Sequence, residues 1–223
     1  HVEQVTTCQR EDRIERLKKI ADVEPRNAPV QGRSKQRSKQ IIDATSELLE
    51  RVGFDDLNTI LIAKEVGISI GSLYHYFPNK HAILYSMGMR WLDEIEIVLK
   101  EFDSWDIENI PLSDLLDDML TTNFKVYKKQ KAILTLVQAM FAVPELRELD
   151  EKHDEMMITT FARLFKRMGM TKQLKERERL GRVYLESTHA VFVTMATQQG
   201  ERAKRTQADL KVMVMALLLS HFN

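Results

Sequence analysis

The chain has 223 residues, which is enough for one large domain or two modest domains with a substantial core. Its 33 basic and 33 acidic residues give a formal net charge of +0, which excludes a protein that coats nucleic acid through its overall charge. Any affinity for DNA must therefore come from a local positive patch.

The single cysteine, Cys8, excludes an intramolecular disulfide and a multi-cysteine zinc site, and it favours the reducing cytoplasm. The chain starts without the basic and then apolar pattern of a secretory signal. Its longest apolar run, 212–219, is far shorter than the roughly 20 residues that cross a bilayer. We therefore expect a soluble, cytoplasmic protein without a membrane partner.

The first 32 residues are predicted to form an N-terminal extension. Within it, residues 11–23 carry apolar side chains at helical spacing, and Pro25, Pro29 and Gly32 separate this short amphipathic helix from the next segment. The sequence leaves open whether the extension folds back on the body, contacts DNA or is a disordered leader.

A run of positive charge comes next, without an acidic residue between Arg26 and Gln40. Its members are Arg26, Arg33, Lys35, Arg37 and Lys39. Such a run is either a solvated, mobile arm or a set of phosphate contacts. The adjacent motif favours phosphate contacts, and we take Lys35 and Arg37 as candidates.

Residues 62–80 predict two short helices joined by a glycine turn. Ile62, Ala63 and Val66 form the apolar face of the first helix, and Gly67 supplies a backbone conformation that other residues reach only with strain. Ser69 is the expected cap of the second helix. Its apolar anchors are Leu73 and Phe77, which leaves Ile70, Gly71, Tyr74 and His75 facing outward. The pattern is that of a DNA-binding helix-turn-helix.

The whole stretch 41–84 resembles the DNA-binding domain of TetR-type transcriptional regulators. Residues 41–49 look like the first helix of that domain, Gly53 and Phe54 like its end, and Asn58 like the cap of the second helix. The third helix and the start of the fourth match in Gly71, Ser72, Leu73, Tyr74, Tyr76, Phe77, Asn79 and Lys80. The resemblance implies an all-helical fold with a small DNA-binding domain and a larger helical domain.

The resemblance also implies roles for single residues. Ile70, Gly71 and Tyr74 would face base edges in the major groove, whereas Thr59, Ser72, Tyr76 and Lys80 would hold phosphates. His75 is either a further phosphate contact or an exposed histidine without a role. The rings of Tyr74 and Tyr76 have an alternative place in the core, with their hydroxyls at its rim.

Three apolar residues depart from the family pattern. Ile60 and Leu61 stand where polar residues are usual, and Ile70 replaces a frequent hydrogen-bond donor or basic residue. Because isoleucine cannot hydrogen-bond a base, contact with a thymine methyl group is the base recognition open to Ile70.

The rest of the chain predicts further helices. We expect them at 80–102, 111–129, 131–143, 144–168, 173–199 and 207–222. In the family the first of these connects the two domains. The last two are apolar over wide arcs, so each is buried on more than one side. Either they form a central core in a monomer, or, as the resemblance implies, they form a four-helix homodimer interface. Its expected residues are Val191, Phe192, Met195, Met213, Leu217 and Leu218.

The resemblance implies a small-molecule pocket in the second domain. Several of the eleven methionines fall on the helices that would surround it, and flexible methionines suit a deformable apolar cavity. Candidate pocket residues are Met119, Phe124, Met140, Met157, Phe161 and Tyr184. The alternative for any one of these residues is an ordinary core position.

An enzyme remains a remote alternative. Glu186 with His189, and Asp150 with His153, place a carboxylate and an imidazole one helical turn apart, as di-iron bundles do. Such sites also need a Glu from each of two further helices. His153 moreover lies in a charged stretch that we expect to be a solvated face. We therefore expect no catalytic residues, no cofactor and no metal site.

The sequence thus predicts an all-α protein in three parts: an extension of unknown role at 1–32, a helix-turn-helix DNA-binding domain at 33–80, and an effector-binding and dimerisation domain at 81–223. The expected function is a one-component repressor that binds a near-palindromic operator in double-stranded DNA as a homodimer. A small, mainly apolar effector is expected to release it. A transcriptional activator, or a regulator with a protein ligand or no ligand, stays open.

Overall fold

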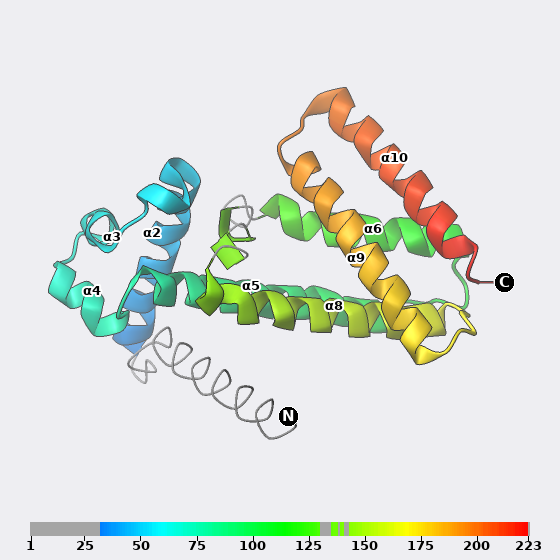
Figure 1. The fold of residues 1–223 in the computed structure, drawn as a ribbon, viewed down its shortest axis with the longest axis horizontal. Helices are drawn as coiled ribbons and strands as arrows, with labels where there is room; N and C mark the ends of the chain where they lie inside the picture. The colour runs from blue at the N-terminus through cyan, green and yellow to red at the C-terminus, as the bar shows by residue number, and fades with distance from the viewer. Residues whose placement is uncertain (1–31, 130–134, 138, 141–142, 223) are drawn as a thin grey trace, which may run out of the picture. The chain divides into compact units, whose positions relative to one another are not determined.

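The computed structural model describes residues 32–129, 135–137, 139–140 and 143–222 (Figure 1). These residues form helices joined by turns, with no strand among them, which confirms the predicted all-α fold. The helices are α2 (Gly32–Asp56), α3 (Thr59–Val66), α4 (Ile70–Tyr76), α5 (Lys80–Glu101), η1 (Phe102–Ser104), α6 (Leu112–Lys129), η2 (Pro144–Leu146), α8 (Arg147–Arg167), α9 (Leu174–Ala196) and α10 (Gly200–Leu219). The predicted helix at 11–23 and most of that at 131–143 lie outside the described residues. No described helix has the length and apolar character needed to cross a membrane.

The described residues form two compact units. Unit 1 contains residues 32–91 and the described part of 135–150, and unit 2 contains residues 92–129 and 151–222. The boundaries fall inside α5 and inside α8. The first half of α5 and the described part of 135–150 thus belong to the same compact unit as the helix-turn-helix.

Gly88 of α5 allows residues 135–150 to pack closely within unit 1. A Cβ atom on Gly88 would collide with the side chain of Leu149 and lie 3.2 Å from Met140 Cε. Both neighbours are buried. Because a larger residue has no room here, the glycine brings a segment distant in sequence against the helix that comes after the DNA-binding motif.

The first helices of unit 1 begin and end as the sequence predicts. Gly53, with φ 77 and ψ 178, interrupts the helical conformation of α2. Asn58 caps α3, since its Oδ1 accepts a hydrogen bond of 2.9 Å from Leu61 N. One difference concerns the N-terminus of α2: it starts at Gly32, so Arg33, Lys35, Arg37 and Lys39 lie in its first turns instead of preceding the helix.

The turn between α3 and α4 depends on Gly67. This residue has φ 73 and ψ 36, and its N–H bonds to carbonyls of the last turn of α3. Ser69 then caps α4 by accepting a hydrogen bond of 3.1 Å from Ser72 N. Leu73 and Phe77 are fully buried, so they fix α4 to the core and turn its opposite face outward.

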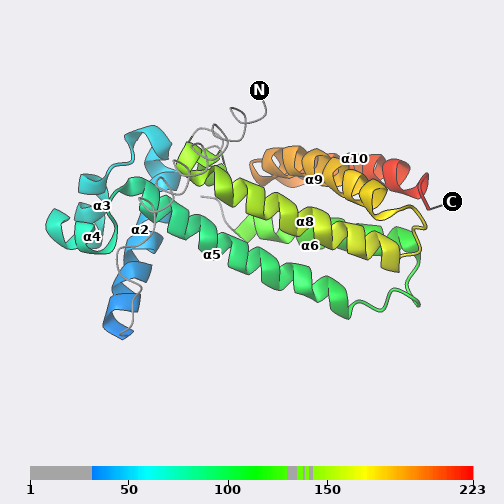
Figure 2. The same ribbon diagram turned by 60° about the horizontal axis from the view of Figure 1, so that its bottom comes forward.

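In unit 2, helices α6, α9 and α10 pack against one another, and the two ribbon views show them side by side (Figures 1 and 2). Their core is rich in aromatic rings, with the centroids of Phe124 and Phe192 5.2 Å apart. An ion pair of 2.9 Å joins Lys211 of α10 to Asp117 of α6. Helix α10 begins seven residues earlier than predicted, directly after Gln199.

We predict opposite effects on stability for alanine at two neighbouring glycines. Gly67→Ala forces a side chain into the left-handed region and should lower the free energy of unfolding by about 1–2 kcal/mol. A Cβ at Gly71 meets only Ser69 Oγ at 4.0 Å, and Gly71 lies inside α4. Gly71→Ala should therefore raise stability by about 0.5–1 kcal/mol. Urea unfolding monitored by circular dichroism measures both; a Gly67 variant as stable as the parent would contradict the account of the turn.

Candidate nucleic-acid interface

The outward face of α4 is as the sequence predicts. Ile70 and Tyr74, one turn apart, have 38% and 41% of their surface exposed, and Gly71 and His75 are exposed beside them. This face thus consists of the aliphatic Ile70, the backbone at Gly71 and the rings of Tyr74 and His75. It contains no lysine, arginine or carboxylate. Its discrimination must rest on shape, methyl contact and the tyrosine hydroxyl.

The predicted phosphate contacts near this face are less exposed than the face itself. Thr59, Ser72 and Tyr76 are half-buried. The ring of Tyr76 meets that of His75 edge to face at 5.3 Å. Thr59 Oγ1 and Tyr74 OH lie 3.1 Å apart, so a hydroxyl from the start of α3 contacts the outward face of α4.

The positive run adds charge at the start of α2. Arg33, Lys35 and Lys39 are exposed there and Arg37 is half-buried, with no acidic residue in the first turn. Arg33 and Lys35 lie in the first turn, where a positive charge opposes the helix dipole at a cost of about 0.3–1 kcal/mol. A polyanion such as DNA bound at this end of α2 would be attracted by these positive charges and would offset their unfavourable interaction with the dipole. This favours phosphate contact over a solvated arm.

Lys80, a predicted phosphate contact, makes its polar contacts within the DNA-binding unit. Its Nζ donates to Phe54 O at 3.2 Å and to Leu57 O at 3.0 Å, and it lies 4.4 Å from the centroid of the Phe54 ring. The ammonium therefore joins the start of α5 to the connection between α2 and α3. A phosphate contact by Lys80 would require it to leave these partners.

Sequence reasoning gave no DNA-contact role to Ile60, yet at 72% it is the most exposed large apolar residue in the part of the chain that the structure describes. It lies in the first turn of α3 next to Thr59. Its departure from the family pattern was the available signal. An exposed aliphatic side chain at this place adds apolar surface to the region that already contains Ile70.

The predicted effector-pocket residues are all buried. Five of them belong to unit 2, whereas Met140 belongs to unit 1. Among the five, the rings of Phe161 and Tyr184 meet at 4.6 Å, and Asn123 Nδ2 donates to Tyr184 OH at 3.1 Å. Burial raises the pKa of Tyr184 well above its ordinary value, so its hydroxyl is protonated and able to hydrogen-bond.

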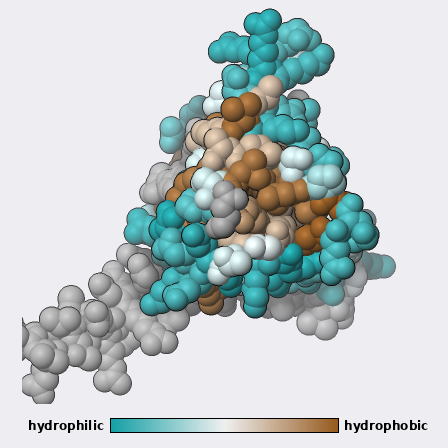
Figure 3. All heavy atoms as spheres, turned by 90° about the vertical axis from the view of Figure 1, so that its right-hand side faces the viewer, coloured by the Kyte–Doolittle hydropathy of each residue, from teal (hydrophilic) through white to brown (hydrophobic). Residues whose placement is uncertain are grey.

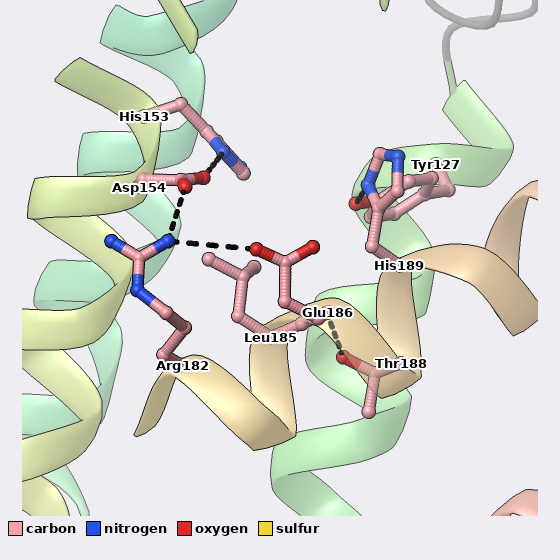
Figure 4. Close-up of polar contacts among 8 residues, drawn as sticks. All are labelled: Tyr127, His153, Asp154, Arg182, Leu185, Glu186, Thr188 and His189. Atoms are coloured by element: carbon pink, nitrogen blue, oxygen red, sulfur yellow. Dashed lines mark hydrogen bonds and ion pairs between the residues drawn. The ribbon is translucent and has the colours of Figure 1, made fainter. Parts of the chain in front are cut away.

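A second polar pair lies in the interior of unit 2. Tyr127 OH and His189 Nδ1 are 2.6 Å apart (Figure 4). Burial raises the pKa of Tyr127, and the charges of Asp154 and Glu186 add to that effect. Burial also lowers the pKa of His189, and His153 lowers it further. A neutral tyrosine and a neutral histidine thus share one hydrogen bond, whose donor depends on the histidine tautomer, and neither group carries a charge there.

Glu186, one of the two carboxylates considered for the enzyme alternative, shares an arginine with Asp154. Arg182 Nη1 lies 3.0 Å from Asp154 Oδ2 and 3.5 Å from Glu186 Oε1 (Figure 4). Burial alone would raise the pKa of Asp154, but hydrogen bonds from His153 and Arg182 outweigh it and lower that pKa. The described residues contain no group of three or more histidine, cysteine or carboxylate side chains arranged for a metal.

The prediction that His153 lies on a solvated face is wrong. His153 is only 5% exposed, and its Nδ1 lies 3.3 Å from Asp154 Oδ1. On α8 it continues the buried stripe of Leu149 and Met157, which lie four residues before and after it. The charged neighbours occupy the other faces of the helix, and the spacing of the apolar residues was the signal for burial.

The residues expected at a dimer interface divide into two groups. Phe192, Met195 and Leu218 are buried within the chain itself, and Val191 and Leu217 are half-buried. Met213 is exposed. Further exposed large apolar side chains on these two helices are Leu174, Val183, Val212 and Leu219. Figure 3 shows the side of the molecule that lies at the right of Figure 1, where α10 ends. Apolar side chains gather there within a hydrophilic surface.

We predict that Lys80→Met destabilises the protein. It leaves the carbonyls of Phe54 and Leu57 without their charged donor, and the loss should be about 1–3 kcal/mol of the free energy of unfolding. Lys64→Met, at an exposed position of α3, is the matched control and should change stability little. Equal stability of the two variants in urea would show that the Lys80 contacts contribute nothing.

The comparisons with known proteins agree over most of the chain. The model of bacterial regulatory proteins of the tetR family matches residues 41–87, and that of the tetracyclin repressor-like C-terminal domain matches residues 111–218. The HTH-type transcriptional regulator BetI of Stenotrophomonas maltophilia is 25% identical over 142 residues, which are 63% of this chain and 72% of the relative. The HTH-type transcriptional repressor KstR of Rhodococcus jostii is 34% identical over 62 residues, 28% of this chain and 29% of the repressor.

Solved structures show the same fold. Salmonella enterica GusR superposes with a TM-score of 0.63 at 20% identity, covering 86% of this chain and 100% of GusR. A TetR-like transcriptional regulator from Rhodococcus sp. RHA1 gives a TM-score of 0.62 at 18% identity, covering 82% and 96% of the two chains. The helix-turn-helix geometry and both family matches lead to one conclusion: the chain belongs to the TetR family of transcriptional regulators, which are not enzymes.

Proposed function

We propose that this TetR-family chain is a cytoplasmic repressor that binds a near-palindromic operator as a homodimer and is released by a small, mainly apolar effector. The observation that supports it most is the outward face of α4, fixed by burial of Leu73 and Phe77 on the opposite face. In this proposal residues 33–80 bind DNA, and the later helices bind the effector and the second copy.

The face of α4 has the size of a DNA-recognition element. This helix has seven residues, too few to recognise more than a few base pairs. A two-fold related copy, about one turn of DNA or roughly 34 Å away, doubles the contacts and requires a near-palindrome. The positive start of α2 supplies the sequence-independent attraction to phosphates.

Selection from a random duplex library with the full chain tests this proposal. We predict a near-palindromic consensus, bound with an affinity that falls steeply with salt because phosphate contacts release counterions. Tyr76→Phe should weaken binding to the consensus and to scrambled DNA alike, whereas Ile70→Ala should change the base preferred at one position. A changed base preference for Tyr76→Phe alone would mean that a different face of α4 enters the groove.

The homodimer is proposed from the apolar side chains that α9 and α10 leave exposed. Val212, Ala216 and Leu219 succeed one another at helical spacing on α10, and Val183 is exposed on α9. A second copy of the same helices would cover these side chains and complete a four-helix interface. The buried Phe192 and Leu218 would support this interface from within each chain.

We predict that Val212→Glu gives folded monomers. Val212 is 69% exposed, so the change leaves the chain's own core intact but places an unpaired charge in the proposed interface. Ile97→Glu on α5, at 63% exposure, is the matched control and should remain dimeric. Sedimentation velocity distinguishes the two outcomes. Dimers of unchanged stability for Val212→Glu would place the interface elsewhere.

The effector proposal rests on the buried interior of unit 2. Five of the six candidate pocket residues lie there, next to polar pairs that give an apolar ligand one place for a hydrogen bond. A ligand that prefers one arrangement of the helices over another by about 3 kcal/mol would change operator affinity by about two orders of magnitude. Helix α5, with 22 residues, spans about 33 Å and directly continues the DNA-binding motif.

We predict that at least one compound among fatty acyl chains, aromatic drugs and steroid-like molecules both raises the melting temperature and lowers operator affinity. Thermal scanning measures binding, and fluorescence anisotropy of labelled operator measures release. A ligand that stabilises the protein but leaves operator affinity unchanged would exclude coupling for that compound. A reporter gene behind the operator distinguishes a repressor from an activator.

A further inference from the structure

The contact between Thr59 and Tyr74 links two residues with different expected roles. Thr59 is the first residue of α3, and Tyr74 lies on the outward face of α4. Their hydroxyl oxygens are 3.1 Å apart, and either one can donate. Asn58 already caps α3 through Leu61 N. The Thr59 hydroxyl therefore serves a purpose other than satisfying the helix end.

The contact fixes the far end of a side chain that is otherwise free to move. Tyr74 is 41% exposed, and the buried anchors of α4 are its neighbours Leu73 and Phe77. A hydrogen bond at the phenolic oxygen restricts both side-chain torsions of Tyr74. It also couples the two hydroxyl protons, because each hydroxyl has one proton and only one of the two can donate across the contact.

Bound DNA would determine which of the two hydroxyls donates. A phosphate oxygen only accepts hydrogen bonds, so a phosphate at Thr59 accepts a hydrogen bond from the threonine hydroxyl. Thr59 Oγ1 must then accept from Tyr74, and the Tyr74 proton points away from the groove. What remains toward the bases is a lone pair on the Tyr74 oxygen. In the major groove the hydrogen-bond donors are the amino groups of adenine N6 and cytosine N4.

We propose that Thr59 is a positioning residue for base recognition. Its hydroxyl donates a hydrogen bond to a phosphate and accepts one from the Tyr74 hydroxyl. The Tyr74 oxygen can then only accept a hydrogen bond from a base, which selects adenine or cytosine. The inference rests on the proposed function, in which α4 enters the major groove. It assigns to Thr59 an effect on sequence preference although Thr59 touches no base.

The test uses the full chain and selection from a random duplex library. Thr59→Val removes the hydroxyl while keeping the shape, Tyr74→Phe removes its partner, and the double variant removes both. Thr59→Ser keeps a hydroxyl and should restore the preference. Ser72→Ala is the matched control, because it removes a predicted phosphate contact outside the pair. Circular dichroism melting confirms that each variant is folded.

The expected result is a position in each half-site where the parent prefers adenine or cytosine. Thr59→Val and Tyr74→Phe should each weaken that preference about fivefold, as for a hydrogen bond of about 1 kcal/mol, and the double variant should weaken it no further. Ser72→Ala should lower affinity for all sequences equally.

Three results would overturn the inference: a parental preference for guanine or thymine at the position that Tyr74→Phe affects, a uniform loss of affinity in Thr59→Val with all preferences unchanged, or additive effects in the double variant. Failure of the parent chain to enrich any sequence would instead overturn the proposed function, and this inference with it. If Thr59→Val fails to fold, Thr59→Ala takes its place, and an unchanged preference for adenine or cytosine in that variant would overturn the inference.

Discussion

The structure depends above all on the turn between α3 and α4. Gly67 adopts a left-handed conformation that closes the turn, and Leu73 and Phe77 are buried on the inner side of α4. Together these constraints leave one orientation for a helix of seven residues, and that orientation turns Ile70 and Tyr74 outward. DNA recognition, the contact with Thr59 and any effect of a ligand all depend on this geometry, because a short helix without it would have no defined face.

Electrostatics supports the same arrangement although the chain as a whole is neutral. The basic residues proposed to contact DNA lie in the first turns of α2, and those in its first turn oppose the helix dipole in the free protein. Other charges are used internally. Lys80 binds two carbonyls of the DNA-binding unit, and Arg182 holds Asp154 and Glu186 in unit 2. The charged residues thus fall into two groups: basic residues at the start of α2 that are proposed to contact phosphates, and residues whose polar contacts join helices within each unit.

Local features of the DNA-binding motif were predictable because they depend on neighbouring residues. A cap, a glycine turn or an anchor such as Leu73 is specified within four or five positions. Features that depend on distant segments were not. Met140 and Leu149 pack against Gly88, and Lys80 donates to carbonyls more than twenty residues away. No local sequence pattern connects these parts of the chain. His153 is intermediate, since its charged neighbours suggested exposure while the apolar spacing of α8 already indicated burial.

The most direct test of the central claim, that the face fixed by the Gly67 turn is what DNA covers, is amide hydrogen exchange of the full chain with and without its selected operator. We predict slower exchange in 33–40 and 59–76 on DNA binding, with 174–196 unchanged because those residues belong to the other unit. Slower exchange concentrated in α9 or α10, with 59–76 unaffected, would contradict it.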